Sequence, residues 1–158
     1  MLVLPAQPYF PLGTLRQALA YPMTADEVSE EDVRIAMAAV GLAHLAHRLD
    51  EEAEWATVLS GGEQQRIGFA RVLINRPTIL MLDDAVSRLR SADARALYDQ
   101  IAARLPDMIV ISTGQSAAHA GPHGRTIRLN GGSAEAHIVS PATPADVPSA
   151  AATLAPQS

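Results

Sequence analysis

The chain has 158 residues, a formal net charge of -5 and no cysteine, and all twelve of its basic residues are arginines. This length fits a single domain, and an acidic chain without a basic cluster argues against nucleic acid as a partner. The missing cysteines exclude disulfides, thiolate metal sites and cysteine nucleophiles. No apolar run approaches the ~20 residues that a membrane span needs, and no basic segment precedes an apolar one at the N-terminus, so we expect a soluble, cytoplasmic chain.

The sequence opens with a predicted strand end, an irregular stretch and a short helix. Val3 to Pro5 ends the strand, and further prolines and a glycine keep the next residues irregular. Thr14 then begins a short helix that Pro22 closes. Apart from this short helix, the residues before the first longer helix are predicted to be loops and turns.

The next segment is predicted to contain two helical pieces. Ser29–Asp32 is typical of a capping box, and the apolar residues that follow at helical spacing lead to a glycine that ends the first piece. The second piece carries His44 and His47 near Glu51. These side chains could hold a metal ion, but because no third clear ligand accompanies the histidines we interpret them as solvated. Trp55 is expected to be a packing anchor beneath the segment that follows.

Residues Leu59–Arg66 read LSGGEQQR and combine a helix-capping residue with two glycines. Ser60 can cap a helix predicted over 63–73, while Gly61 and Gly62 let the backbone approach a ligand closely. The N–H groups of the first helical turn point outward and the helix dipole favours negative charge, so the segment predicts an anion site with phosphate as its occupant. The alternative is an ordinary helix cap without a ligand.

An apolar run that ends in two carboxylates follows at a short interval. After a break at Arg76 and Pro77, residues 78–84 read TILMLDD, which suits a strand buried on both faces of a parallel sheet. Asp83 and Asp84 then lie at the carboxyl end of the strand, where α/β folds bind ligands. Hard oxygen ligands at that edge suit Mg²⁺ on a nucleotide.

Beyond the two carboxylates we predict one helix and a second buried strand. The helix begins at Ser91 or Asp93 and ends at Pro106, and the strand is Met108–Ser112. One apolar stripe of the helix is made by Ala94, Leu97, Ile101 and Leu105. Further on, residues 126–139 predict a closing hairpin with its turn at Asn130–Gly132.

Together these motifs resemble the C-terminal half of the ATPase domain of ABC transporters. Residues 59–66 match the signature motif, residues 79–84 the Walker B motif and residues 85–89 the D-loop, in family order and spacing. The resemblance covers Leu4 to Gly132 and implies an α/β fold, a partial P-loop NTPase-like parallel sheet with an α-helical signature subdomain. Residues 4–16 also resemble the Q-loop region of half-transporters in the branch of peroxisomal fatty-acyl exporters and bacterial vitamin B12 or peptide transporters.

The resemblance divides the chain into four parts. These are a Q-loop-like region at 1–22, the helical subdomain with the signature at 23–75, the part of the α/β core from Walker B onward at 76–139, and a tail at 140–158. The tail consists mainly of Ala, Pro, Ser and Thr, so we expect it to be disordered.

The resemblance also implies that ATP binds between two such domains facing head to tail, the signature of one contacting the γ-phosphate of a nucleotide held by the other. The residues that it places at this phosphate are Leu59, Ser60, Gly61, Gly62, Glu63 and Gln64. It assigns Asp83 to Mg²⁺, through water, Asp84 to the general-base position and Gln115 to the position of a histidine that touches the γ-phosphate. The implied partners are a second ABC ATPase domain and a transmembrane permease domain, which would hold the chain at the cytoplasmic face of the membrane.

Several residues depart from the family pattern. Asp84 replaces Glu and is one methylene shorter, which would place an attacking water roughly 1 Å or more out of reach and slow catalysis on the order of 10²-fold. Gln115 cannot carry the charge of a histidine, and Arg90 stands where the D-loop usually has Asp. At the Q-loop, Ala6 aligns with the family's glutamine. Gln7 could take its place after a one-residue shift, but we interpret it as a surface residue.

The absence of lysine also bears on function. A P-loop needs G-x-x-x-x-G-K-[ST], whose lysine reaches the β- and γ-phosphates, and this chain contains none. Because the family's P-loop lies upstream of the Q-loop, we expect the chain to begin within the fold and to be inactive alone. Three hypotheses follow: a fragment of an ATP-hydrolysing domain that drives transport, a non-hydrolysing partner that lends its signature in trans as in the degenerate half of heterodimeric exporters, and an inert remnant.

Overall fold

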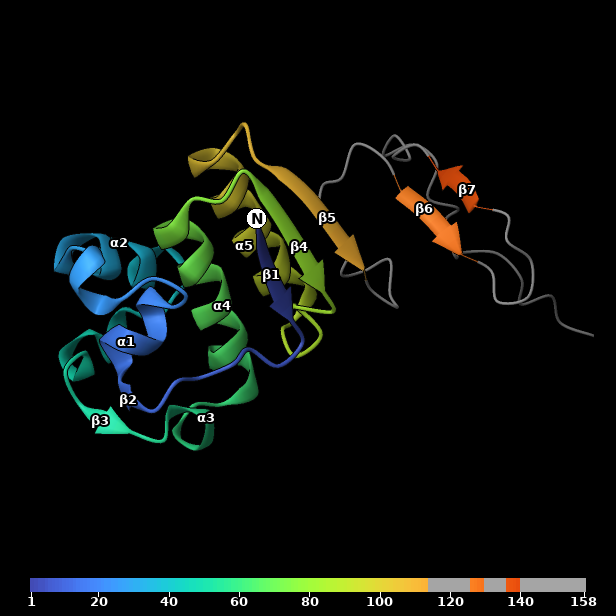
Figure 1. Ribbon diagram of the computed structural model, residues 1–158. Helices are drawn as coiled ribbons and strands as arrows, with labels where there is room; N and C mark the ends of the chain where they lie inside the picture. Colours follow the sequence, from blue (N-terminus) through green and yellow to red (C-terminus); the bar gives the residue numbers. More distant parts are fainter. Residues whose placement is uncertain (114–125, 130–135, 140–158) are drawn as a thin grey trace, which may run out of the picture. The chain divides into compact units, whose positions relative to one another are not determined.

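The computed structural model describes residues 1–113, 126–129 and 136–139. The chain divides into two compact units, Met1–Pro122 and His123–Ser158, and each is described by itself. The first unit is built on a three-stranded parallel sheet with α4 beside it (Figure 1). Its strands stand in the order β1 (Leu2–Pro5), β4 (Ile79–Asp83) and β5 (Ile109–Thr113). The predicted α/β fold with a parallel sheet is therefore confirmed.

Helices make up most of the remaining described chain in this unit. They are α1 (Leu15–Ala20), α2 (Glu30–Ala39), α3 (Trp55–Val58), α4 (Gly61–Asn75) and α5 (Ser91–Arg104), with the 3₁₀ helices η1 (Ala25–Glu27) and η2 (Ala43–Arg48). A short antiparallel pair, β2 (Gly13–Thr14) and β3 (Glu52–Ala53), lies at the outer end of the helical part (Figure 1).

Local hydrogen bonds explain where the first helices begin. Thr14 caps α1, because its hydroxyl accepts from the Gln17 N–H at 3.2 Å while the Gln17 side chain accepts from the Thr14 N–H at 2.8 Å. Ser29 caps α2 by accepting from the Asp32 N–H at 3.1 Å. Both helix starts agree with the prediction. The piece predicted after Gly41 is a 3₁₀ helix, η2.

Helix α4 is longer than the sequence pattern predicted. It begins at Gly61, two residues before the predicted start, and extends to Asn75. It ends because Arg76 adopts the left-handed conformation, with φ 44°, and because Pro77 cannot continue the hydrogen-bond ladder.

The two faces of the sheet are unequal, which corrects one prediction. Leu80 and Leu82 of β4 are fully buried, whereas Met81 between them is 37% exposed. On the neighbouring strands, Val3 and Ile111 pair with Met81 and are also exposed. The expectation that residues 78–84 form a strand buried on both faces is therefore wrong for the described chain, and the predicted second buried strand is also partly exposed. Among residues 1–113, helices cover one face of the sheet, and the pleat of each strand sends alternate side chains to the other face.

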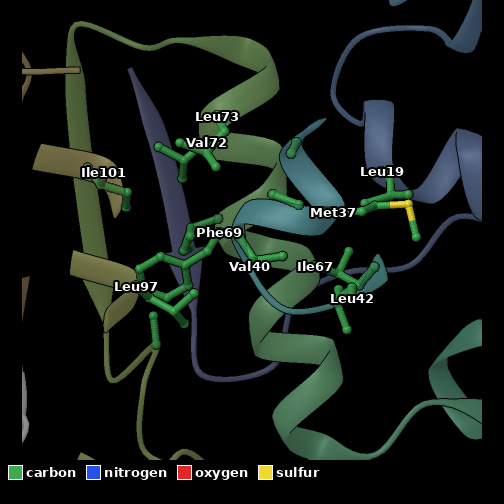
Figure 2. Close-up of a cluster of buried hydrophobic side chains, with 14 of the residues drawn as sticks. Leu19, Met37, Val40, Leu42, Ile67, Phe69, Val72, Leu73, Leu97 and Ile101 are labelled. Atoms are coloured by element: carbon green, nitrogen blue, oxygen red, sulfur yellow. The ribbon is translucent and has the colours of Figure 1, made fainter. Parts of the chain in front are cut away.

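The core lies on the covered face and centres on α4. Phe69 and Val72 of this helix pack beside Leu97 and Ile101 of α5, as Figure 2 shows. The Phe69 and Tyr98 rings meet edge to face, with their centroids 6.1 Å apart. On the other side of α4, Ile67 lies near side chains of α1 and α2, the helices that precede the signature segment (Figure 2). These contacts make α4 the element that joins the sheet to the helical part.

A buried arginine fastens α1 to α4. Arg71 is 3% exposed, its Nε donates to the Ala18 carbonyl at 2.7 Å, and its guanidinium lies over the Phe10 and Tyr21 rings at 5.1 and 5.3 Å. Burial lowers the pKa of Arg71 to about 10. Because the guanidinium donates to the Ala18 carbonyl, its charge lies near the carboxyl end of α1, where the helix dipole favours a cation.

The described part of the second unit is one strand pair. β6 (Thr126–Leu129) and β7 (Ala136–Val139) pair antiparallel, with Ile127 opposite Ile138, which confirms the two predicted strands. The predicted turn at Asn130–Gly132 and the tail from Ser140 lie outside the described residues. None of the helices that the structure describes is both long and apolar enough to cross a membrane.

Candidate functional site

The signature segment, residues 59–66, forms the loop and first turn of α4. Ser60 is the N-cap residue: its hydroxyl accepts from the Glu63 N–H at 3.3 Å and donates to the Glu63 carboxylate at 2.6 Å. The same carboxylate accepts from the Ser60 N–H at 2.9 Å, which completes a capping box. Gly61 and Gly62 occupy the first turn, where backbone N–H groups have no acceptor within the helix.

Neighbouring side chains hold this loop in place. The Gln64 amide donates to the carbonyls of Ala56 and Leu59, at 2.8 and 3.1 Å. Trp55 is 1% exposed in the short helix before the loop, and the Arg48 guanidinium lies 4.8 Å from its ring. Trp55 is thus the packing anchor that the sequence predicted. The predicted candidate residues of the signature thus lie in one hydrogen-bonded turn.

Glu63 carries the charge nearest to the cap. The hydrogen bond from the Ser60 hydroxyl, with smaller contributions from the Ser60 N–H and from His44 at 3.1 Å, lowers the pKa of Glu63. His44 is largely exposed, and its partner is this carboxylate. Among the described residues, no three His, Asp or Glu side chains form a cluster that could hold a metal ion.

Replacing Glu63 with glutamine tests the charge of this cap. Glutamine keeps the capping geometry but not the charge, so we expect a loss of about 0.5 kcal/mol in the free energy of unfolding at pH 7. The pKa of Glu63 is lower in the folded than in the unfolded chain, so its stabilising effect is present above about pH 4.3 and is lost as the pH falls through the folded value. Urea titrations between pH 3 and 7 should show the difference between the two proteins shrinking at low pH. In a Ser60→Ala background, which removes the largest contribution, the pH-dependent difference should be clearly smaller; an unchanged difference would contradict this assignment.

The D-loop segment, residues 85–89, packs directly on the signature glycines. A Cβ added to Gly61 would lie 2.6 Å from Cδ and 2.9 Å from Nη1 of Arg88, and one added to Gly62 would lie 3.5 Å from Cδ2 of Leu89. A side chain at position 61 would therefore have to displace the Arg88 side chain. The result is a guanidinium beside the first turn of α4, at the point where the sequence predicts an anion.

Asp83 and Asp84 lie at the carboxyl end of β4, as predicted. The Thr113 hydroxyl of β5 donates to the Asp83 carboxylate at 2.7 Å. Asp84 has a positive φ of 52°, and its carbonyl accepts from the Ser87 hydroxyl at 2.9 Å. Two carboxylates and a hydroxyl are hard oxygen donors of the kind that suits Mg²⁺ on a nucleotide, so the residues present fit that ion. Gln115 lies outside the described residues.

Three further positions singled out in the sequence are Gln7, Arg90 and Ala6. Gln7 is exposed, in keeping with its interpretation as a surface residue. Arg90 is the N-cap residue of α5 and pairs with Asp93 at 3.0 Å. The Ala6 carbonyl accepts a hydrogen bond from Gln65.

Gln65 is the residue that the sequence reading missed. It is 1% exposed, and its amide makes hydrogen bonds to the chain after β1 and to the D-loop. A signal for it exists, because position 65 lies four and seven residues before Phe69 and Val72, on the buried stripe of α4. A glutamine on an apolar stripe predicts a buried amide with specific partners.

Comparison with known proteins gives the same picture. The chain matches the family model described as ABC transporter over residues 6–87. It is 38% identical over 113 residues to an uncharacterized ABC transporter ATP-binding protein of Haemophilus influenzae, covering 72% of this chain and 19% of that protein. It is 37% identical over 142 residues to the lysosomal cobalamin transporter ABCD4 of Mus musculus, covering 84% of this chain and 23% of that protein.

A solved structure, that of a bacterial Atm1-family ABC exporter with ATP bound, superimposes with a TM-score of 0.70 at 25% identity, covering 81% of this chain and 23% of that one. The chain thus spans about a fifth of the length of these relatives. The family match includes the signature and Walker B motifs on which the resemblance rested. The chain belongs to the ABC transporter family and corresponds to part of its ATP-binding domain.

Proposed function

We propose that the signature segment of this chain binds the γ-phosphate of ATP held by a second ABC ATPase domain, packed head to tail against it. The observation that carries the proposal is the first turn of α4, where Gly61 lies against the Arg88 side chain and Gly62 follows it. Backbone N–H groups at a helix start, the helix dipole and a guanidinium are all favourable to a phosphate.

The donors in this proposed site are backbone groups and Arg88. The Ser60 hydroxyl directs its proton to Glu63, so Ser60 fixes the shape of the turn. Gln64 supports that shape by holding the carbonyls of Ala56 and Leu59. We therefore assign Leu59, Ser60, Glu63 and Gln64 to shaping the turn and the two glycines to contacting phosphate.

The acidic edge of β4 has a separate proposed role. Asp83, whose carboxylate accepts from the Thr113 hydroxyl, would hold Mg²⁺ through water, and Asp84 would take the general-base position, one methylene shorter than a glutamate. A bound Mg²⁺ would neutralise phosphate charge at this edge. By the resemblance, Gln115 stands at the position of a histidine that touches the γ-phosphate, and it cannot carry that charge. With the shorter Asp84 at the general-base position, hydrolysis at the chain's own edge is expected to be slow.

The assembly proposed for this chain follows its relatives. We propose that it works with a second ABC ATPase domain and a transmembrane permease domain, at the cytoplasmic face of a membrane, and couples ATP binding and hydrolysis to transport. A specific observation favours the trans role over catalysis at the chain's own acidic edge: the signature glycines Gly61 and Gly62 are intact, whereas Asp84 is one methylene shorter than the family's glutamate.

The experiment compares two substitutions in the assembled protein, reconstituted with a full-length ABC ATPase partner. Ser60→Arg places a long side chain in the first turn of α4, and we expect it to abolish the partner's ATP hydrolysis. Asp84→Ala should change that activity less than about twofold, because Asp84 faces the other site. Ala56→Arg adds the same side chain at an exposed position of α3 and serves as the matched control.

Each outcome decides between the hypotheses. If Asp84→Ala is the more damaging change, the trans role is wrong and the chain supplies its own catalytic carboxylate. If neither substitution alters hydrolysis while both proteins still assemble with the partner, the chain is an inert remnant. Loss of activity in Ala56→Arg as well would show that the arginine disturbs assembly and would remove the support for a phosphate site.

A further inference from the structure

Gln65 is one of two polar side chains that are buried in the described part of the chain, the other being Arg71. Its Nε2 donates to the Ala6 carbonyl and to the Ser87 hydroxyl, each at 3.2 Å, and its Oε1 accepts from the Arg88 N–H at 3.0 Å. Both of its N–H donors and one lone pair of its carbonyl are therefore used. A buried amide satisfied in this way has one defined orientation.

The three partners come from segments far apart in the sequence. Ala6 follows β1, while Ser87 and Arg88 belong to the D-loop segment that follows β4. Gln65 itself lies one turn after the glycines of the signature. One side chain thus connects the loops at the carboxyl ends of two neighbouring parallel strands with the start of α4.

The contacts continue from Gln65 to both parts of the candidate site. Through Ser87, whose hydroxyl donates to the Asp84 carbonyl at 2.9 Å, they reach the backbone of Asp84, the residue that follows β4. Through the Arg88 N–H they fix the backbone of the residue whose guanidinium lies against Gly61. Gln65 is thus the residue whose side chain joins the stretch after β1 to the D-loop.

We infer that Gln65 is a positioning residue that sets the D-loop relative to the signature and thereby places Arg88 at the phosphate site and Asp84 at the acidic edge. The positioning role follows from the hydrogen bonds of Gln65, whereas its expected effect on ATP turnover rests on the proposed function. The adjacent Gln64 provides the contrast. It is on the same helix with the same side chain, but its hydrogen bonds stay within residues 56–59.

Amide hydrogen exchange of the full chain tests the positioning role. In Gln65→Leu, which has no polar atoms, amides of residues 84–90 and 6–10 should exchange about tenfold faster, while those of α2 stay unchanged. Gln65→Glu keeps an acceptor for the Arg88 N–H but places an oxygen against the Ala6 carbonyl, so protection should return at Arg88 and not at 6–10. Gln64→Leu is the matched control and should affect residues 56–60 only.

Uniformly faster exchange across α2 and α4 in both Gln65 variants, or the same pattern in Gln64→Leu, would overturn the inference. If Gln65→Leu does not fold, Ser87→Ala replaces it, because this change removes one contact and should speed exchange at 84–90 alone. With an ABC ATPase partner, Gln65→Glu should lower kcat about tenfold at an unchanged KM for ATP. If Ser60→Arg leaves turnover intact while the exchange pattern holds, the proposed phosphate site fails and the positioning role stands.

Discussion

Replacing Leu82 with asparagine is expected to unfold the chain. Leu82 is 1% exposed in the middle strand of the sheet, between β1 and β5. The change removes buried apolar surface and introduces an amide without partners, at a combined cost of about 4 kcal/mol or more. Small domains are stable by about 5–15 kcal/mol, and with one face of its sheet exposed this chain should lie at the low end of that range. Urea unfolding followed by circular dichroism should therefore show a midpoint near zero denaturant.

The neighbouring residue provides the matched control. Met81→Asn is the same kind of change one position earlier, on the exposed face of β4, and should cost less than about 1 kcal/mol. It also interrupts the apolar stripe of Val3, Met81 and Ile111, so light scattering should report less self-association than in the original chain. Equal destabilisation by the two substitutions would mean that this face is covered in solution.

Replacing Trp55 with alanine is expected to be the second strongly destabilising change. The indole is 1% exposed and is stacked under the Arg48 guanidinium, so its removal should cost about 3–5 kcal/mol. Because the chain contains one tryptophan, intrinsic fluorescence is lost with it and circular dichroism must follow the unfolding. The loop before Ser60 loses its support in the same variant.

Trp55→Phe separates packing from hydrogen bonding. In the described structure the indole Nε1 is buried without a hydrogen-bond partner, so an aromatic ring lacking that group should cost no more than about 1.5 kcal/mol. A loss as large as that in Trp55→Ala would show that the indole nitrogen makes an important contact.

Local chemistry made the helix starts predictable. Thr14, Ser29 and Ser60 each carry a hydroxyl that reaches a backbone N–H three residues on, and this interaction depends on nothing outside the helix. The apolar run before Asp83 likewise identified the strand and its acidic end. Such features depend on a few residues that are neighbours in the sequence.

Burial of the strands was not predictable in the same way. The run of residues 79–82 is apolar at every position, so the pattern cannot say which face a helix will cover. That choice depends on which elements pack on each side of the sheet. Gln65 was missed for a related reason: its partners, Ala6 and Arg88, are brought together only by the parallel pairing of β1 and β4.

The strand order has a consequence for how the chain reaches its structure. β4 pairs with β1, where Leu2 lies opposite Leu80, and with β5, where Ile79 lies opposite Ile109. Closing the loop to β1 costs more chain entropy than closing the shorter loop to β5, and sheets dominated by such distant pairings fold slowly. The β4–β5 pair is therefore expected to form first. Of these three strands β1 is therefore the last to pair, and until then its apolar side chains are open to association with other chains.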